Sequence, residues 1–313
     1  MLIRFFAGAI LALVLAVALG GCVTAFAGKP SPGGEFVDIG GRHLRLVCAG
    51  PESARPVVWF ESGAFGQAED FAVVQSRLVQ EGVRSCAYDR AGLGFSDPGP
   101  RPRDGAAILA DRDALIARAG VTGPFVVVAH SFGGLHARLW TASRPGEVAG
   151  LVLIDAAQPE GIEAPGAEVW VRRFGQFARV ASGAAALGLL KPVAVFAGDQ
   201  IGLPPAEAAL KKRTFGSARH NRWSAAEVIT AFETGRQALD AGPIPPALPV
   251  AVITAGPEQA ERSAWSDART APARNSRAGS VGNVAAASHA SILGRQHAEV
   301  VVQAVLRVLA DAR

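Results

Sequence analysis

Short apolar segments of strand length alternate with longer segments of helical periodicity along the first half of the chain. The predicted strands are Phe36–Ile39, His43–Val47, Val57–Phe60, Val83–Tyr88, Phe125–Ala129 and Leu151–Ile154, and the predicted helices are Phe71–Gln80, Ala106–Ala119 and Gly134–Ser143. Strands that alternate with helices favour a mostly parallel sheet with helices on both faces. The last two strands are apolar without alternation, which is typical of central strands buried on both sides.

The pattern changes between Gln158 and Gly242, where Ala-rich helical segments are broken by glycine and proline and no strand is evident. The strand pattern resumes at 249–254, a further strand is predicted around Asn283–Ala286, and an amphipathic helix is predicted over Ala298–Leu309. An α/β core interrupted by a helical insertion is therefore expected. Five aromatic residues are spread through the insertion and either line an apolar pocket or, as we expect for most of them, pack in its core: Trp170, Phe174, Phe177, Phe215 and Trp223.

The N-terminal residues have the pattern of an export signal. Arg4 precedes an apolar run from Phe5 to Leu19, which ends in Leu-Gly-Gly-Cys at Cys22. The run is shorter than the roughly 20 residues that a membrane span needs. The Leu-Gly-Gly-Cys sequence resembles the lipobox of bacterial lipoproteins, which implies lipidation of Cys22. We expect residues 1–21 to be a signal peptide and 22–34 a lipidated N-terminus and linker; an ordinary signal peptide and an uncleaved anchor are the alternatives.

Composition and charge exclude several classes of function. The chain has 313 residues, of which 50% are apolar, so it can bury a large core. Its formal charge is +4, but the basic residues are scattered and form no stripe of the kind that nucleic-acid binding requires. No cluster of Cys, His or carboxylate residues has metal-ligand spacing, and no Gly-rich phosphate loop is present. We therefore expect no nucleic-acid partner, no metal and no cofactor.

The segment Val128–Gly134 is suited to present a nucleophile. A strand is predicted to end here and to turn sharply into a helix, and Ser131 lies at the turn. Small residues at Ala129 and Gly133 let the strand and the helix approach each other closely. The first helical amides point toward the serine, where they stabilise a developing anion.

Four segments in order resemble the α/β-hydrolase superfamily, namely Val57–Ala64, Tyr88–Asp97, Val128–Gly134 and Leu151–Ala157. The resemblance covers Phe36 to Gln158 and Pro249 to the end. It implies an α/β-hydrolase fold with a mostly parallel eight-stranded sheet, a core formed by residues 35–157 and 243–313, and a helical cap over 158–242. In the second segment we expect a structural tight turn in which Asp89 and Arg90 pair locally.

A serine hydroxyl needs a base, and the chain order in this fold is serine, acid, histidine. His289 is the predicted base because it follows the last predicted strand, where the superfamily carries its histidine. The weaker candidates are His130, beside the nucleophile and expected to point away, His136 in a helix, and His220 in the insertion. The acid is either Asp155, at the end of a core strand, or Glu258, in the loop after the next strand. We favour Asp155 because that loop lacks the usual aspartate.

Two further assignments follow. The resemblance places the oxyanion-stabilising amides at Phe132, after the nucleophile, and at Ala64, after the third core strand. Export would leave Cys48 and Cys86 as the two cysteines of the mature domain in an oxidising compartment, so they either form a disulfide or stay buried and reduced. In the usual sheet order of the superfamily their strands are neighbours, which favours the disulfide.

These features predict a serine hydrolase that cleaves a carboxylic ester or similar acyl substrate through an acyl-enzyme on Ser131. Epoxide hydrolase and dehalogenase chemistry is disfavoured because those members of the fold use an aspartate nucleophile. Peptidase, lactonase and acyltransferase activities on the same residues are alternatives, as is a catalytically silent binding protein. The expected location is the bacterial cell envelope, with a lipid anchor in a membrane and the enzyme on the periplasmic side or outer surface.

Overall fold

The computed structural model describes residues 8, 11, 12, 15, 31–257 and 264–312. Cys22, the predicted lipidation site, and Glu258, the alternative acid, lie outside the described residues. The predicted signal segment is also largely outside them.

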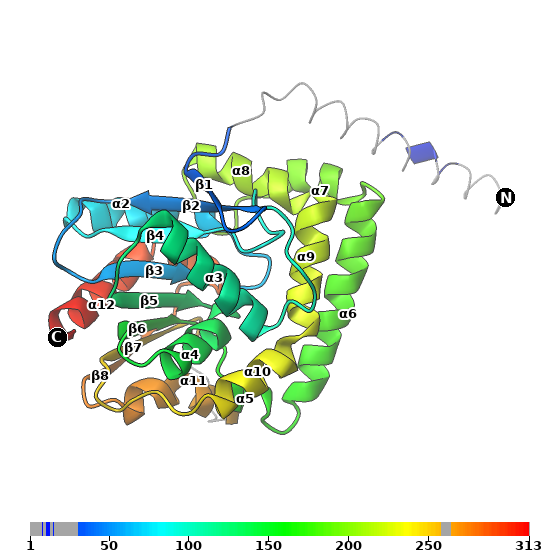
Figure 1. Cartoon of the computed structure of the whole chain (residues 1–313). Coiled ribbons are helices and arrows are strands. Elements are labelled where there is room, and N and C mark those ends of the chain that lie inside the picture. The colour runs from blue at the N-terminus through cyan, green and yellow to red at the C-terminus, as the bar shows by residue number, and fades with distance from the viewer. Residues whose placement is uncertain (1–7, 9–10, 13–14, 16–30, 258–263, 313) are drawn as a thin grey trace.

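An eight-stranded sheet forms the centre of the molecule (Figure 1), in the order β1-β2-β4-β3-β5-β6-β7-β8. Its strands are β1 (Glu35–Asp38), β2 (His43–Ala49), β3 (Val57–Glu61), β4 (Ser85–Tyr88), β5 (Phe125–His130), β6 (Val148–Ile154), β7 (Val250–Ala255) and β8 (Gly279–Val284). β2 pairs antiparallel with β1 and β4, and all the other pairs are parallel. The predicted mostly parallel α/β-hydrolase sheet is confirmed.

Each central strand supplies two hydrophobic cores, because successive side chains of a strand point to opposite faces. Trp59 of β3 and Val127 of β5 belong to the core under α3 (Gly105–Ala119) and α4 (Gly133–Ser143). Phe60 and Val128, the next residues, belong to the core under α2 (Ala72–Gln80) and α12 (Ala298–Asp311). Burial on both faces explains why these strands are apolar without alternation.

The helical insertion between β6 and β7 forms one side of the molecule (Figure 1). Its helices are α5 (Pro159–Ile162), α6 (Ala167–Ala186), α7 (Leu190–Phe196), α8 (Pro205–Phe215), α9 (Ala218–Ile229) and α10 (Ala231–Asp240). α6 lies along α9, and α10 packs on α3 and α4 of the core. No strand occurs between β6 and β7, a region that the structure describes throughout.

Two elements near the C-terminus differ from the prediction. β8 covers Gly279–Val284 rather than Asn283–Ala286, and α11 (Ala264–Asn275) was not predicted. α11 is polar, contains Pro272 and buries only alanines, Ala268 and Ala273, so it lacks the apolar periodicity that predicts a helix. β8 is largely exposed, which removes the apolar signal of a buried strand. Two short 3-10 helices, η1 (Ala68–Phe71) and η2 (Ser291–Leu293), complete the described elements.

The expectation that most aromatic residues of the insertion pack in its core was wrong. Trp170 and Phe177 of α6 are 57% and 60% exposed, and Phe215 is 40% exposed. Phe174 and Trp223 are partly buried. The face of α6 that packs on the protein is instead lined by small residues.

The disulfide between Cys48 and Cys86 is present, in agreement with the prediction. The two residues are directly opposite each other in the antiparallel pair of β2 and β4, with their Cα atoms 4.0 Å apart. The bond closes a loop with a sequence separation of 38 residues, which includes all of β3 and α2. It thus ties the antiparallel edge of the sheet to its parallel part.

Replacing both cysteines with serine should destabilise the protein by about 4 kcal/mol, because a cross-link over a loop of this length removes conformational entropy from the unfolded chain. Urea unfolding of the parent, with and without reductant, and of the double variant measures this effect. The reduced parent should unfold at the midpoint of the double variant. Equal midpoints for the oxidised and reduced parent would show that the bond adds no stability.

Candidate active site

Ser131 lies at a sharp turn between β5 and α4, as predicted. Its backbone has a φ of 54°, a left-handed conformation that is strained for a residue other than glycine. The glycines that follow are sterically required: a Cβ on Gly133 would lie 2.3 Å from the carbonyl oxygen of Glu61, and one on Gly134 would lie 2.2 Å from that of Ala157. The close approach of α4 to β3 and to the loop after β6 therefore fixes the position of the serine.

The structure brings Ser131, His289 and Asp155 together. His289 lies between β8 and η2, and its Nε2 is 2.9 Å from Ser131 Oγ. Its Nδ1 is 2.5 Å from Oδ2 of Asp155, the residue after β6. In the tautomer that satisfies both bonds, Nδ1–H donates to the carboxylate and Nε2 accepts from the serine hydroxyl. Asp155, the acid that we favoured, thus occupies the position of a triad acid. Glu258, the alternative, lies outside the described residues.

Asp155 is held as an anion by its neighbours. Burial acts to raise the pKa of its carboxyl, but the hydrogen bond from His289 and the charge of Arg269 outweigh burial and lower that pKa. Arg269, on α11, forms an ion pair with Oδ1, the oxygen that His289 does not contact. The backbone N–H of Ala255 donates to the same oxygen at 3.3 Å. Both carboxylate oxygens are therefore occupied, which fixes the plane of the carboxylate against the imidazole.

Two backbone amides without an acceptor among the described residues lie close to Ser131. A Cβ on Gly63 would lie 2.9 Å from Ser131 Cβ, so the loop after β3 passes directly beside the serine. Within the described part of the chain, no acceptor is found for the N–H of Ala64 in that loop or for the N–H of Phe132. Unpaired amides beside a nucleophile are suited to stabilise an oxyanion. The amides of Ala64 and Phe132 therefore stay the predicted oxyanion donors.

Arg90 binds the loop after β3, so the prediction that it pairs locally within its own turn was wrong. It does not pair with Asp89: its guanidinium donates to the carbonyl oxygens of Ser62 at 2.7 Å and Gly63 at 2.9 Å, and it forms a fully buried ion pair with Glu227 of α9 at 2.8 Å. Asp89 instead pairs with Arg45 of β2. The adjacent side chains point to different sides of the turn, so sequence proximity was misleading. Arg90 links the insertion to the loop that carries the Ala64 amide.

His130 contacts His289, although it was expected to point away. Its Nε2–H donates to the backbone carbonyl oxygen of His289 at 2.8 Å, and the two imidazole rings are 4.6 Å apart. Burial and the neighbouring His289 lower the pKa of His130 to about 3, so the ring is neutral. Because a carbonyl can only accept, the hydrogen bond fixes the tautomer of His130. His130 is a positioning residue for the loop that carries His289.

Replacing His130 with phenylalanine should lower kcat about 100-fold with little change in KM, because a small displacement of a catalytic group has an effect of this size. Glutamine, which keeps a donor, should restore most of the rate. Steady-state kinetics of both variants test this. An equal loss in both, or a change confined to KM, would contradict the positioning role.

His220 joins α9 to the core and makes the protein acid-sensitive. Its Nδ1 accepts from the N–H of Gly94 at 2.9 Å, and burial, followed by the charge of Lys211, lowers its pKa to about 3. Below a pH of about 6.5 the unfolded chain binds a proton on this imidazole that the folded chain does not bind. Stability from this group is therefore complete above that pH and is lost as the pH falls toward 3.

We expect His220→Gln to reduce the slope of unfolding free energy against pH by about 1.4 kcal/mol per pH unit between roughly pH 5.5 and 4. Denaturant unfolding of parent and variant across this range measures the difference. Identical slopes would mean that His220 is protonated in the folded protein.

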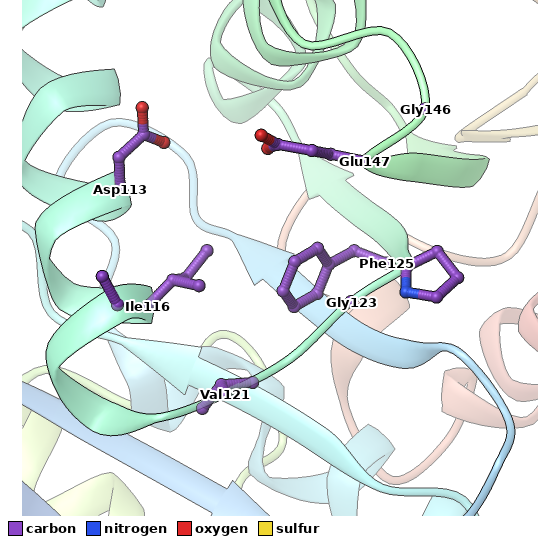
Figure 2. Close-up of a pocket in the computed structure, with 9 residues that line it drawn as sticks. Asp113, Ile116, Val121, Gly123, Phe125, Gly146 and Glu147 are labelled. Atoms are coloured by element: carbon purple, nitrogen blue, oxygen red, sulfur yellow. The ribbon is translucent and has the colours of Figure 1, made fainter.

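A depression of about 600 Å³ lies far from these residues, between α3 and the amino end of β5 (Figure 2). Ser131 follows the carboxyl end of the same strand, and sites in parallel sheets occur at that end. Asp113 and Glu147 border the depression, but they already accept hydrogen bonds from Arg144 and Trp140. Nothing in its lining points to a ligand. Among the described residues, no group of three or more His, Cys, Asp or Glu side chains could hold a metal ion.

Residues 56–245 match the α/β hydrolase fold family, and the chain belongs to this family. A candidate epoxide hydrolase of Pseudomonas aeruginosa superposes with a TM-score of 0.67 and 18% identity, covering 92% of this chain and 99% of that chain. The enol-lactonase of Burkholderia xenovorans LB400 gives a TM-score of 0.59 and 17% identity, covering 88% of this chain and 100% of that one. At these identities the likeness concerns the fold.

Curated relatives match over parts of the chain. An uncharacterised protein of Schizosaccharomyces pombe is 28% identical over 190 residues, which cover 59% of this chain and 34% of the relative. An uncharacterised vacuolar membrane protein of Saccharomyces cerevisiae is 32% identical over 109 residues, which cover 34% of this chain and 17% of that protein. The matched part thus spans about a third or less of the length of these two relatives.

Proposed function

We propose that the chain is a serine hydrolase that cleaves carboxylic esters through an acyl-enzyme on Ser131. The observation that carries this proposal is the hydrogen-bonded series Asp155–His289–Ser131, with distances of 2.5 and 2.9 Å. His289 Nε2 takes the hydroxyl proton as Ser131 Oγ attacks the substrate carbonyl. Asp155 keeps the imidazole in the required tautomer and stabilises the imidazolium without taking its proton.

The remaining steps use the same groups. The N–H groups of Ala64 and Phe132 stabilise the oxyanion of the tetrahedral intermediate, and each such donor typically lowers the barrier by about 2.7 to 4 kcal/mol. The imidazolium of His289 gives its proton to the departing alcohol, which leaves an ester on Ser131. Water, deprotonated by His289, then attacks this ester and releases the acid, and the proton returns to Ser131.

The identity of the nucleophile decides between the two activities named among the structural neighbours. A serine oxygen that opened an epoxide would form an ether, which water does not readily cleave, so the enzyme would stop after one event. Attack on a lactone or an open-chain ester forms an acyl-enzyme that water can hydrolyse. The chemistry of Ser131 therefore favours an ester or lactone substrate, in the sense of the enol-lactonase rather than the epoxide hydrolase.

Turnover of p-nitrophenyl esters of increasing acyl length and of styrene oxide by the full chain tests this choice. We expect ester hydrolysis with an initial burst of p-nitrophenol and no opening of the epoxide. Epoxide opening without ester turnover would contradict the proposal. No reaction with either substrate would favour the alternative of a catalytically silent binding protein.

The proposed location is the bacterial cell envelope, with the chain anchored by a lipid on Cys22. The Leu-Gly-Gly-Cys sequence supports export and lipidation, and the Cys48–Cys86 disulfide supports an oxidising compartment. The partial match to a vacuolar membrane protein also agrees with a location at a membrane. Mass spectrometry of the N-terminal peptide of the protein purified from membranes tests the anchor; an unmodified Cys22 would contradict it.

A further inference from the structure

α6, α7 and the turn between them expose several large apolar side chains. Seven of them are more than half exposed: Val169, Trp170, Phe177, Val180, Leu187, Val193 and Phe196. The buried face of α6 consists of Val171, Gly175, Ala178 and Ala185, and α6 lies along α9. Val169, Trp170, Phe177 and Val180 therefore lie on faces of α6 that its packing on the insertion leaves uncovered, and the other three residues continue the exposed surface along the turn and α7. We call these seven residues the apolar face.

One edge of the apolar face borders the Ser131 site. Phe65 lies in the loop that passes beside Ser131, and its ring is 6.3 Å from that of Phe174 and 6.5 Å from that of Phe177. Residues of α6 spaced by three or four lie on one face of a helix, which places Trp170 beside this pair. Trp170 also contacts Trp265 of α11, at a centroid distance of 5.9 Å. Apolar aromatic rings thus extend from the oxyanion loop to the exterior.

The charges around the apolar face are mostly positive. Between residues 167 and 196 there are four basic side chains and one acidic one, Glu168, which pairs with Arg172. The others, Arg173, Arg179 and Lys191, are exposed. Exposed apolar residues next to basic ones are typical of helices that lie on an anionic lipid surface. No single described helix is long and apolar enough to cross a membrane, whereas α6 and α7 meet that test together but are bent by 98°.

The residues just before β1 are connected to the helical insertion through a series of hydrogen bonds. Arg45 donates to the carbonyl oxygen of Gly33 at 2.7 Å and to Glu69 at 2.6 Å. Gln67 donates to Glu69 and accepts from Thr214 of α8, and α8 packs on α7. A lipid on Cys22 would thus be separated from residues bound to the insertion by about ten residues.

We propose that the apolar face lies on the anionic membrane surface that holds the N-terminus, so that ester substrates with long acyl chains pass from the lipid along the aromatic rings to Ser131. The lipid surface is the single occupant that explains the apolar residues, the basic residues and the position of the tether together. The substrate part of this inference rests on the proposed ester hydrolysis, and the tether rests on the proposed lipid anchor, whereas the exposed apolar and basic residues of α6 and α7 depend on neither.

Fluorescence quenching of the full chain tests the contact. The protein is reconstituted into vesicles of phosphatidylglycerol and phosphatidylcholine in which the phosphatidylcholine carries bromine on its acyl chains, a quencher of tryptophan. Trp59 and Trp140 are fully buried and serve as internal references. We expect strong quenching of the parent that is largely lost in Trp170→Phe. Equal quenching in parent and variant would overturn the proposal.

A charge introduced into the apolar face should separate lipid delivery from chemistry. Val180→Glu and Leu187→Glu change side chains that are 71% and 74% exposed, so the fold should tolerate them. Together they should lower turnover of a long-chain ester embedded in the vesicles about tenfold, since charged groups are costly in an apolar phase. Hydrolysis of a soluble short-chain ester should not change. Val300→Glu, an exposed valine of α12 on the opposite side of Figure 1, is the matched control and should affect neither substrate.

The outcomes distinguish the two proposals. Ester turnover without lipid quenching of Trp170 would leave the proposed function intact and overturn the membrane contact. Lipid quenching of Trp170 without any ester turnover would support the membrane contact and overturn the proposed function. If the chain in detergent is instead a dimer that Val180→Glu dissociates, and Trp170 is not quenched, the apolar face is an interface between two copies and the membrane contact is overturned.

Discussion

Replacing Ser131 with alanine is expected to lower kcat for ester hydrolysis by about 10⁶-fold, because loss of the nucleophile in a comparable triad has an effect of this size. The 2.9 Å contact with His289 Nε2 is lost with the hydroxyl, while the strained turn is kept. Alanine is smaller than serine and should fit the same left-handed backbone at little additional cost. The measurement is steady-state turnover of a soluble p-nitrophenyl ester.

Ser143, at the end of the helix that follows Ser131, provides a matched control. Ser143→Ala should retain the parental rate, and both variants should have parental circular dichroism. A folded Ser131→Ala variant that keeps more than about a tenth of the activity would contradict the assignment of the nucleophile, since only about 1.4 kcal/mol of barrier would then be attributed to it.

Replacing Asp155 with asparagine should lower kcat about 10⁴-fold, because an amide in this position stabilises the wrong tautomer of the histidine. Asparagine keeps the size of the side chain but cannot accept on both oxygens, so Nδ1–H of His289 and the guanidinium of Arg269 compete for one acceptor. The loss should occur in kcat rather than in KM. The pH dependence of kcat is measured in the same experiment, to detect whether the imidazole of His289 still acts as the base.

Glu258→Gln is the matched variant for the alternative acid. It should retain the parental rate, because Asp155 already fills the position beside His289 Nδ1. A loss in Glu258→Gln with activity retained in Asp155→Asn would reverse the assignment of the triad acid. That result would leave the hydrolase mechanism intact but would overturn the role proposed for Asp155.

The central part of the fold was predictable because its strands are buried on both faces. Burial requires uninterrupted apolar residues in β5 and β6, and the turn at Ser131 requires small residues on either side of it. The same physical constraints therefore appear directly in the sequence. The position of His289 after the last strand came from the family resemblance, because a single histidine carries no periodic signal.

Other features of the site were not predictable because they depend on contacts between distant segments. Arg269 lies on a polar helix that buries only alanines, so neither the helix nor its contact with Asp155 has a signal in the sequence. Arg90 binds a glutamate 137 residues away in the insertion. His130 contacts a backbone carbonyl, a partner that any residue type could provide. In each case the partner is set by the tertiary fold.

Backbone strain marks the same site. The described non-glycine residues with positive φ are Phe65, Ser131 and Asp155. They lie in the loop after β3, at the proposed nucleophile and at the proposed triad acid. Strained residues persist where the surrounding structure overdetermines them, and they gather at functional sites. The close packing at Gly133 and Gly134 and the hydrogen bonds of Arg90 supply that constraint here.

The most direct test of whether His289 and Asp155 activate Ser131 uses a fluorophosphonate, which labels only an activated serine. The full chain is analysed by mass spectrometry after reaction with this reagent. We expect one adduct, located on the peptide that contains Ser131. It should be absent in Ser131→Ala and form much more slowly in Asp155→Asn. An unlabelled parent protein, or an adduct on another serine, would contradict the proposed activation of Ser131.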